Sequence, residues 1–201
     1  MNNKGYTLAE VLITLGVIGV IAAMTLPILI QKQQKRVTEV KLQKFYSVMS
    51  NALTRYYADE GIMPENFVFP DEIVLPNHII KYEQWFKDTL GKYINSIKSG
   101  RDSYFYMVLS DGSGFYSYVN SINEAYFFYC TDFKYCGVEE ADGKNSFLFR
   151  IKNGKFMTYS SEISDRKTLK AGCAENKKLR HYCSRLIEFD GWKIKDDYPA
   201  W

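Results

Sequence analysis

The sequence predicts an α+β protein in which a long N-terminal helix packs on a small antiparallel β-meander domain. Three observations lead to this fold class. Residues 11–30 form an uncharged apolar run, an amphipathic repeat follows directly, and short aromatic segments separated by turn residues fill the region after residue 100. One helix followed by consecutive strands is typical of this class, since each element buries one apolar face against the other.

The apolar run at residues 11–30 has the length of a membrane-spanning helix. At ~1.5 Å per residue, about twenty helical residues span ~30 Å, the thickness of a bilayer's hydrocarbon core. Gly16 and Gly19 lie in this run and let another helix approach closely. Pro27 removes one backbone hydrogen bond. We therefore expect a kink or local melting of the helix at Pro27.

Glu10 stands at the head of this apolar run. A charged side chain within a membrane costs about 2.5–3.5 kcal/mol on insertion scales, so such residues are rare and usually functional. A plain signal anchor explains the length of the run but not the acid. A secretory signal peptide would have a shorter apolar core and a small-residue cleavage site. The glutamate therefore needs a cation close to it.

The sequence KGYTLAE at residues 4–10, followed by the apolar run, resembles the N-terminus of type IV prepilins and type II secretion pseudopilins. That family has a short basic leader ending in glycine, an aromatic residue, Thr-Leu, a glutamate and an apolar helix interrupted by proline. Gly5 matches the last leader residue, Tyr6 the first mature residue and Glu10 the buried acid. Pro27 falls where the family often breaks its helix. The family usually has Phe where this chain has Tyr6.

The resemblance implies that a prepilin peptidase cuts between Gly5 and Tyr6 and methylates the new amine of Tyr6. The cut would create an α-amino group about one helical turn from Glu10. In a filament, the carboxylate of Glu10 would meet the Tyr6 ammonium of the next subunit. Such a buried polar pair would set the axial register between neighbouring subunits, as buried polar residues set the register of helices in coiled coils. Other partners implied are pilin or pseudopilin subunits and an inner-membrane assembly platform.

From residue 34 to residue 60 the pattern becomes that of an amphipathic helix with one buried face. Its apolar stripe consists of Val37, Val40, Phe45, Val48, Met49, Ala52, Leu53 and Tyr56. We therefore expect one helix from Tyr6 to Glu60, with two helices joined at Pro27 as the alternative. The predicted divisions are a leader at 1–5, a transmembrane and filament-core helix at 6–33, its amphipathic half at 34–60 and a globular α+β domain at 61–201.

The globular domain is predicted to begin with an irregular, proline-containing connection and a helix at residues 78–97. The strands expected after it are residues 104–109, 115–119, 125–130, 147–151 and 155–159. Turn sequences support two hairpins, because Gly112 follows Asp111 between the first two strands and Gly154 follows Asn153 between the last two. This helix-plus-meander arrangement matches the pilin architecture in outline.

The four cysteines form an even set in the C-terminal half of the chain. Four cysteines allow three full pairings. Pairing of neighbours, Cys130–Cys136 and Cys173–Cys183, closes short loops, each worth about 2–3 kcal/mol of chain entropy. A disulfide-closed C-terminal loop is also common in pilins. The spacing does not match zinc knuckles, while free buried thiols remain the other alternative. We predict the neighbour pairing.

The sequence shows no motif of a catalytic or phosphate-binding site. His78 and His181, the histidines of the chain, are interpreted as surface or packing residues, so we predict no enzyme and no cofactor. Major pseudopilins bind calcium in their C-terminal region, and the residues here that could do so are Glu139, Glu140, Asp142 and Asn145. Their spacing does not fit the EF-hand loop. The prediction is therefore a solvated acidic turn with no metal centre, and calcium is the alternative.

Charge gives conflicting indications about orientation and argues against one class of partner. The net charge of +3 is too weak to indicate nucleic-acid binding. The basic residues flanking the span lie mainly after it, which by the positive-inside rule favours a cytoplasmic C-terminus. They are Lys32, Lys35, Arg36, Lys41 and Lys44, against Lys4 before the span. The leader motif and the cysteines favour the opposite orientation, which we adopt: a single-pass inner-membrane protein whose C-terminal domain lies outside the cytoplasm.

The sequence therefore predicts a structural subunit, pilin-like or pseudopilin, of a bacterial type IV pilus or type II secretion-type filament. The alternative is a minor subunit at the filament tip that acts as a module for adhesion, cargo or DNA binding. An enzyme displayed on a membrane anchor is the third and least favoured hypothesis. The sequence leaves open whether the filament is a pilus, a secretion pseudopilus or a DNA-uptake fibre.

Overall fold

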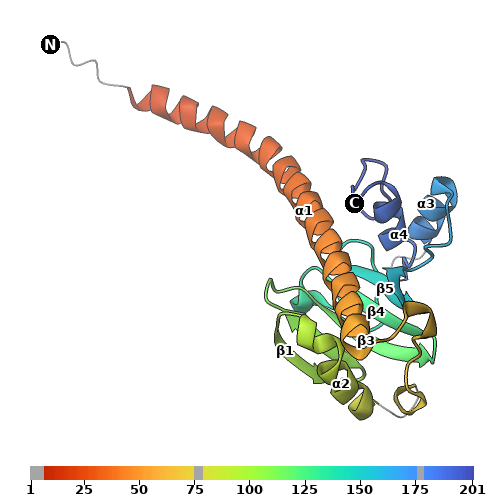
Figure 1. Ribbon diagram of the computed structural model, residues 1–201. Coiled ribbons are helices and arrows are strands. Elements are labelled where there is room, and N and C mark those ends of the chain that lie inside the picture. The colour runs from red at the N-terminus through yellow and green to blue at the C-terminus, as the bar shows by residue number, and fades with distance from the viewer. Residues whose placement is uncertain (1–6, 75–78, 176–178) are drawn as a thin grey trace. The chain divides into compact units, whose positions relative to one another are not determined.

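The computed structural model describes residues 7–74, 79–175 and 179–201 (Figure 1). The chain divides into two compact units, Met1–Val37 and Thr38–Trp201. Helix α1 (Leu8–Glu60) contributes its first part to one unit and its second part to the other. The prediction of one N-terminal helix ending at Glu60 is thereby confirmed from Leu8 onward, while Tyr6 lies outside the described residues.

In the first unit, α1 is helical from Leu8 onward and continues through Pro27. The helix therefore does not melt at Pro27, and the alternative of two helices joined there is contradicted. The expected kink at Pro27 stays a prediction. A proline removes one hydrogen bond of the helix, and the bonds on both sides keep the helix intact. The large apolar side chains of residues 8–30 are exposed, from 42% for Val11 to 79% for Leu8. The stretch is long and apolar enough to cross a membrane.

In the second unit, one face of α1 is buried by the globular domain. The buried residues of this face are Thr38, Leu42, Phe45, Met49, Ala52, Leu53, Tyr56 and Tyr57. Their spacing of three and four residues is that of one helical face. Val37 and Val40 are 41% and 59% exposed, so their predicted place in the apolar stripe is wrong. The buried stripe runs instead through Thr38 and Leu42, and Val40 lies on the opposite side of the helix.

Among the described residues, six strands form one antiparallel sheet in the order β1-β2-β3-β4-β5-β6. The strands are β1 (Ser96–Arg101), β2 (Phe105–Leu109), β3 (Gly114–Ser121), β4 (Glu124–Cys130), β5 (Ser146–Lys152) and β6 (Lys155–Thr158). The predicted meander is confirmed for β2 to β6. At the β5–β6 turn, Asn153 and Gly154 have φ of 48° and 72°, as a two-residue type I′ hairpin requires.

The other helices are α2 (Ile79–Asp88), α3 (Arg166–Glu175) and α4 (Cys183–Phe189), with 3₁₀ turns at Pro64–Asn66, Asp71–Ile73, Leu90–Tyr93 and Phe133–Tyr135. The helix predicted for residues 78–97 is wrong beyond Asp88. The chain turns there, and Ile97 belongs to β1, whose pairing with β2 supplies hydrogen bonds that the local sequence did not indicate. Cys130 is bonded to Cys136, and Cys173 to Cys183.

The two faces of the sheet carry different aromatic clusters, because successive side chains of a strand point to opposite faces. On the inner face Phe45 of α1 stacks on Tyr129 at a centroid distance of 4.1 Å and also contacts Phe115 and Phe149. The outer face carries Tyr104, Tyr106, Tyr116, Tyr118, Tyr126, Phe128, Phe133 and Tyr159. The inner cluster fixes α1 to the sheet, while part of the outer cluster stays accessible.

Candidate functional site

The start of α1 is a capping box formed by Thr7 and Glu10. The hydroxyl and the backbone N–H of Thr7 both donate to Glu10 Oε2 at 2.8 Å, and the Glu10 N–H donates to Thr7 Oγ1 at 3.3 Å. This arrangement satisfies backbone donors that a helix start otherwise leaves unpaired. The role of Thr7 was not predicted from the sequence, although the spacing Thr-x-x-Glu is typical of a capping box. Gly5 and Tyr6 lie outside the described residues.

The face of α1 that carries Gly16 and Gly19 is open. A Cβ added at either glycine would meet no atom within 4 Å. Small residues of this kind allow two helix backbones to approach closely. The first unit therefore combines an internally bonded carboxylate at its head with an uncharged helix that has room for a neighbouring helix.

The calcium candidates do not form one cluster. Asp142 Oδ1 accepts from the N–H groups of Lys144, Asn145 and Ser146, all at 2.8 Å. Asn145 Oδ1 accepts from the hydroxyl of Thr131, at 2.8 Å.

Glu139 and Glu140, the other two calcium candidates, take no part in these hydrogen bonds of Asp142 and Asn145. Glu139 accepts from the hydroxyl of Tyr104 at 2.7 Å, and the carboxylate of Glu140 lies beside Gly137. Within residues 7–74, 79–175 and 179–201, no group of three or more His, Cys, Asp or Glu side chains could hold a metal ion.

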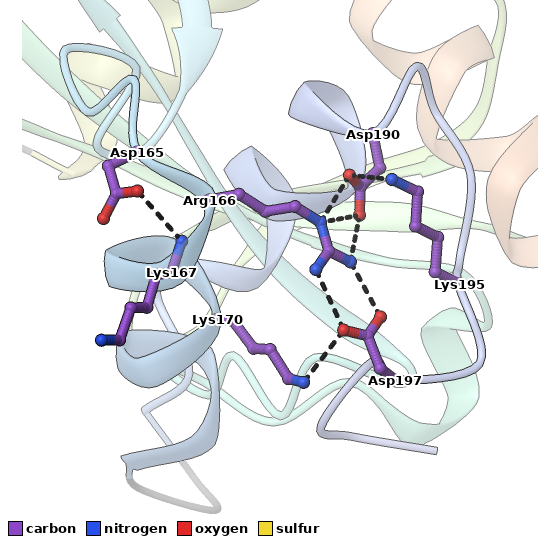
Figure 2. Close-up of polar contacts among 7 residues, drawn as sticks. All are labelled: Asp165, Arg166, Lys167, Lys170, Asp190, Lys195 and Asp197. Atoms are coloured by element: carbon purple, nitrogen blue, oxygen red, sulfur yellow. Dashed lines mark hydrogen bonds and ion pairs between the residues drawn. The ribbon is translucent and has the colours of Figure 1, made fainter.

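Arg166 is the centre of an ion-pair network that joins α3 to the C-terminal segment (Figure 2). Its guanidinium donates to both oxygens of Asp190, with Nη2–Oδ2 at 2.8 Å, and to both oxygens of Asp197, with Nη2–Oδ1 at 2.8 Å. Lys170 pairs with Asp197 at 2.9 Å and Lys195 with Asp190 at 2.7 Å. This network was not predicted from the sequence, because the cations of α3 and the carboxylates that they bind lie far apart along the chain.

The network stabilises charged carboxylates. Hydrogen bonds from Arg166 and Lys170 hold the pKa of Asp197 well below its usual range. The pKa of Asp190 is also lowered. Burial of its side chain, which is 4% exposed, acts to raise the pKa, but the hydrogen bonds from Arg166 and Lys195 outweigh this effect. The network therefore links α3 to the segment that follows α4.

A cleft of about 730 Å³ lies beside the β5–β6 hairpin and contains the buried guanidinium of Arg150. Arg150 pairs with Glu124 at 3.2 Å and with Glu162 at 2.5 Å. His181 contacts the ring of Tyr159, and burial lowers its pKa. The cleft is also lined by Glu65, Lys152, Lys155 and Ser161. His78 lies outside the described residues.

Comparison with known proteins assigns most of the chain to one family. Residues 28–201 match the model described as "Family of unknown function (DUF6613)". The chain belongs to this family. Outside that match, residues 1–26 fit the prokaryotic N-terminal methylation motif, which contains Glu10 and the first part of α1. The DUF6613 domain thus follows a prepilin-type N-terminus.

Among curated proteins, the type IV major pilin protein PilE1 of Neisseria gonorrhoeae is 30% identical to this DUF6613 protein over 109 residues. The alignment covers 54% of this chain and 45% of the relative, so the chain spans less than half of that pilin's length. No solved structure matches. The motif and the relative together make the chain type IV pilin-like, and the motif with its apolar helix makes it a membrane-anchored protein.

Proposed function

We propose that this chain is a structural subunit of a type IV pilus or type II secretion-type filament. Prepilin peptidase cuts it between Gly5 and Tyr6 and methylates Tyr6, and the subunit is then extracted from the inner membrane through an assembly platform. The observation that carries the proposal is Glu10, a carboxylate just before the exposed, uncharged residues 11–30 of α1. The methylation motif over residues 1–26 supports it.

The physics of the first unit favours assembly. Outside lipid, the apolar surface of residues 11–30 would face water, and such a large contiguous patch requires a partner. Packing against the same helix of neighbouring subunits covers this surface, and the open face at Gly16 and Gly19 allows close contact. Cleavage before Tyr6 supplies a cation near Glu10. The Glu10 carboxylate then exchanges its bonds to Thr7 for an ion pair with the Tyr6 ammonium of the next subunit.

The processing step is tested by the intact mass of the protein extracted from membranes. We expect the loss of residues 1–5, the added mass of one methyl group and four fewer hydrogens for two disulfides. A chain that keeps its first five residues while the cells build filaments contradicts the proposal.

The assembly step is tested with Glu10→Val. We expect normal membrane insertion but a loss of at least tenfold in sheared filaments, because the Tyr6 ammonium of the neighbour is left without its partner, a loss of several kcal/mol in a buried pair. Glu60→Gln removes an exposed acid at the other end of α1 and serves as the matched control. Wild-type amounts of Glu10→Val in sheared filaments would show that the carboxylate is not an assembly residue.

A minor, tip-located subunit is the second candidate, and the outer face of the sheet favours it. Tyr104 stacks on Tyr118 at 4.7 Å between centroids, and Tyr118 contacts Tyr126 at 5.5 Å. All three side chains are partly exposed, and tyrosine is enriched where proteins bind partners. The amount of this chain in purified filaments separates the two candidates. A structural subunit dominates the preparation, whereas a tip subunit is scarce.

A further inference from the structure

A group of cations lies on one face of α1 just after the apolar run. Lys32, Lys35 and Arg36 are three and four residues apart, a spacing that places them on the same side of a helix. Lys32 and Arg36 are exposed and Lys35 is partly exposed. The sequence contains no acidic residue between Glu10 and Glu39. The charge of this face is therefore not balanced by its own stretch of helix.

The next carboxylate along the helix, that of Glu39, already has partners in the globular unit. Glu39 accepts from Lys193 Nζ at 3.1 Å and from the N–H of Ile194 at 2.8 Å. Among the residues that the structure describes, Lys32, Lys35 and Arg36 have no ion pair or hydrogen bond of their side chains.

The next basic residues of α1 behave differently. Lys41 donates to the carbonyl oxygen of Thr131 at 2.7 Å, and Lys44 pairs with Asp111 at 2.8 Å. The basic residues after the span therefore form two classes. Lys41 and Lys44 bind groups of the globular unit and hold α1 against it, whereas the three preceding cations make no such contact within the described part of the chain.

The position of these three cations matches the headgroup layer of a membrane. If the hydrocarbon core ends at Ile30, the backbone of Lys32 lies ~3 Å beyond it and that of Arg36 ~9 Å beyond it. The polar layer of each leaflet is about 5–8 Å thick. Long basic side chains reach lipid phosphates over this distance, and the guanidinium of arginine binds a phosphate through two parallel hydrogen bonds.

We propose that Lys32, Lys35 and Arg36 bind the headgroups of anionic phospholipids where α1 leaves the bilayer. The charge of the site, the lack of internal partners and its continuity with the span favour this occupant. Each cation near an anionic surface increases binding about fivefold, so three of them favour an anionic over a zwitterionic lipid by roughly 100-fold at low salt. The proposal goes beyond filament assembly and holds for either orientation of the span.

The test uses the full-length chain in nanodiscs made of equal amounts of phosphatidylglycerol and phosphatidylcholine. Native mass spectrometry after mild detergent release counts the lipids that stay bound. We expect wild type to retain phosphatidylglycerol at least tenfold over phosphatidylcholine at low salt, and less at high salt because screening weakens the contact. The variant K32Q/K35Q/R36Q should retain the two lipids about equally.

Two control variants make the result specific. K92Q/K152Q/K155Q removes the same charge from exposed lysines of the globular unit and should keep the wild-type lipid ratio. K32R/K35R/R36K keeps the charge at the site and should also keep it. The proposal is overturned if wild type retains both lipids equally, or if K32Q/K35Q/R36Q keeps the wild-type lipid ratio. It is also overturned if either control variant loses the preference for phosphatidylglycerol. A chain that selects phosphatidylglycerol but never enters filaments would contradict the proposed function alone.

Discussion

Asp111 in the turn between β2 and β3 is one of the residues that hold α1 on the sheet. It pairs with Lys44 at 2.8 Å and accepts from the N–H and the hydroxyl of Ser113 at 3.1 and 2.5 Å. Partial burial raises the pKa of Asp111, but the bonds from Lys44 and Ser113 more than offset this and lower the pKa to about 2. The folded protein thus favours the charged form of this carboxyl.

This pKa predicts a dependence of stability on pH. An unfolded Asp has a pKa of about 3.9, so the contribution of Asp111 is fully present above that value and is lost as the pH falls towards about 2. We expect Asp111→Asn to lower the unfolding free energy by about 1–2 kcal/mol at neutral pH and to flatten its decline between those values. Denaturant titrations at several pH values measure this, with exposed Asp71→Asn as the control. Identical pH profiles for wild type and Asp111→Asn would contradict the assignment.

Arg166 supports a second prediction at the level of single residues. Arg166→Met leaves Asp190, with its 4% exposed side chain, bonded to Lys195 alone. An under-compensated buried charge is costly, and we expect a loss of about 2–3 kcal/mol in unfolding free energy. Guanidinium unfolding followed by tryptophan fluorescence measures it. Lys167→Met, at the exposed neighbour on α3, should change stability by less than about 0.5 kcal/mol. Equal effects of the two variants would show that the network contributes nothing.

At the scale of elements, α1 changes its partner along its length. Its first part exposes apolar side chains and suits lipid or neighbouring helices, whereas from Thr38 onward one face is buried by the sheet. Phe45 is central to that contact, because it is 1% exposed and touches rings from β3, β4, β5 and β6. The packing of a buried helical face, rather than helix propensity, accounts for most of the stability of such an element.

Phe45→Ala therefore tests the contact between α1 and the sheet. Removing a buried phenylalanine leaves a cavity and costs about 3–5 kcal/mol. We expect a large fall in the melting temperature of the globular unit, measured by near-UV circular dichroism of the full chain in detergent. Val40→Ala, at a position that is 59% exposed, should leave the melting temperature almost unchanged. A fall no larger than that of Val40→Ala would mean that the helix does not depend on this ring.

At the scale of the whole molecule, the C-terminal region is closed by covalent and ionic links. The Cys173–Cys183 bond joins α3 to the start of α4, and the Arg166 network joins α3 to the segment after α4. Tyr198 donates to the carbonyl of Gly143 at 2.7 Å, which fastens the same segment to the β4–β5 loop. These links position the C-terminal segment with groups of the chain itself.

Calcium should therefore not be needed for folding. We expect the melting temperature to be the same with excess calcium and with a chelator, because both side chains already accept hydrogen bonds from the protein. Asp142 accepts from the N–H groups of its own turn, and Asn145 accepts from the hydroxyl of Thr131 and the N–H of Asp132. Magnesium is the control for ionic strength. A saturable rise in melting temperature with calcium, absent with magnesium and abolished by Asp142→Ala, would establish a site at this loop.

The sequence by itself determined the features that depend on local pattern. The apolar length of residues 11–30, the helical stripe through Phe45 and the Asn153–Gly154 turn follow from periodicity and backbone preference, which are properties of neighbouring residues. The prepilin-type motif around Glu10 is local in the same way, and it indicated the family resemblance that comparison then confirmed. Thr7 was missed, although its spacing from Glu10 was visible.

Only the tertiary structure decided which distant groups meet. Strand β1 depends on hydrogen bonds from β2. The local sequence alone predicted a helix up to residue 97, because it does not show this pairing. Arg166 finds Asp190 and Asp197 through the docking of the C-terminal segment on α3. Lys41 and Lys44 differ from Lys32, Lys35 and Arg36 in having partners in the loops of the sheet, Asp111 between β2 and β3 and Thr131 after β4. Such pairings join residues far apart in sequence, so no local pattern encodes them.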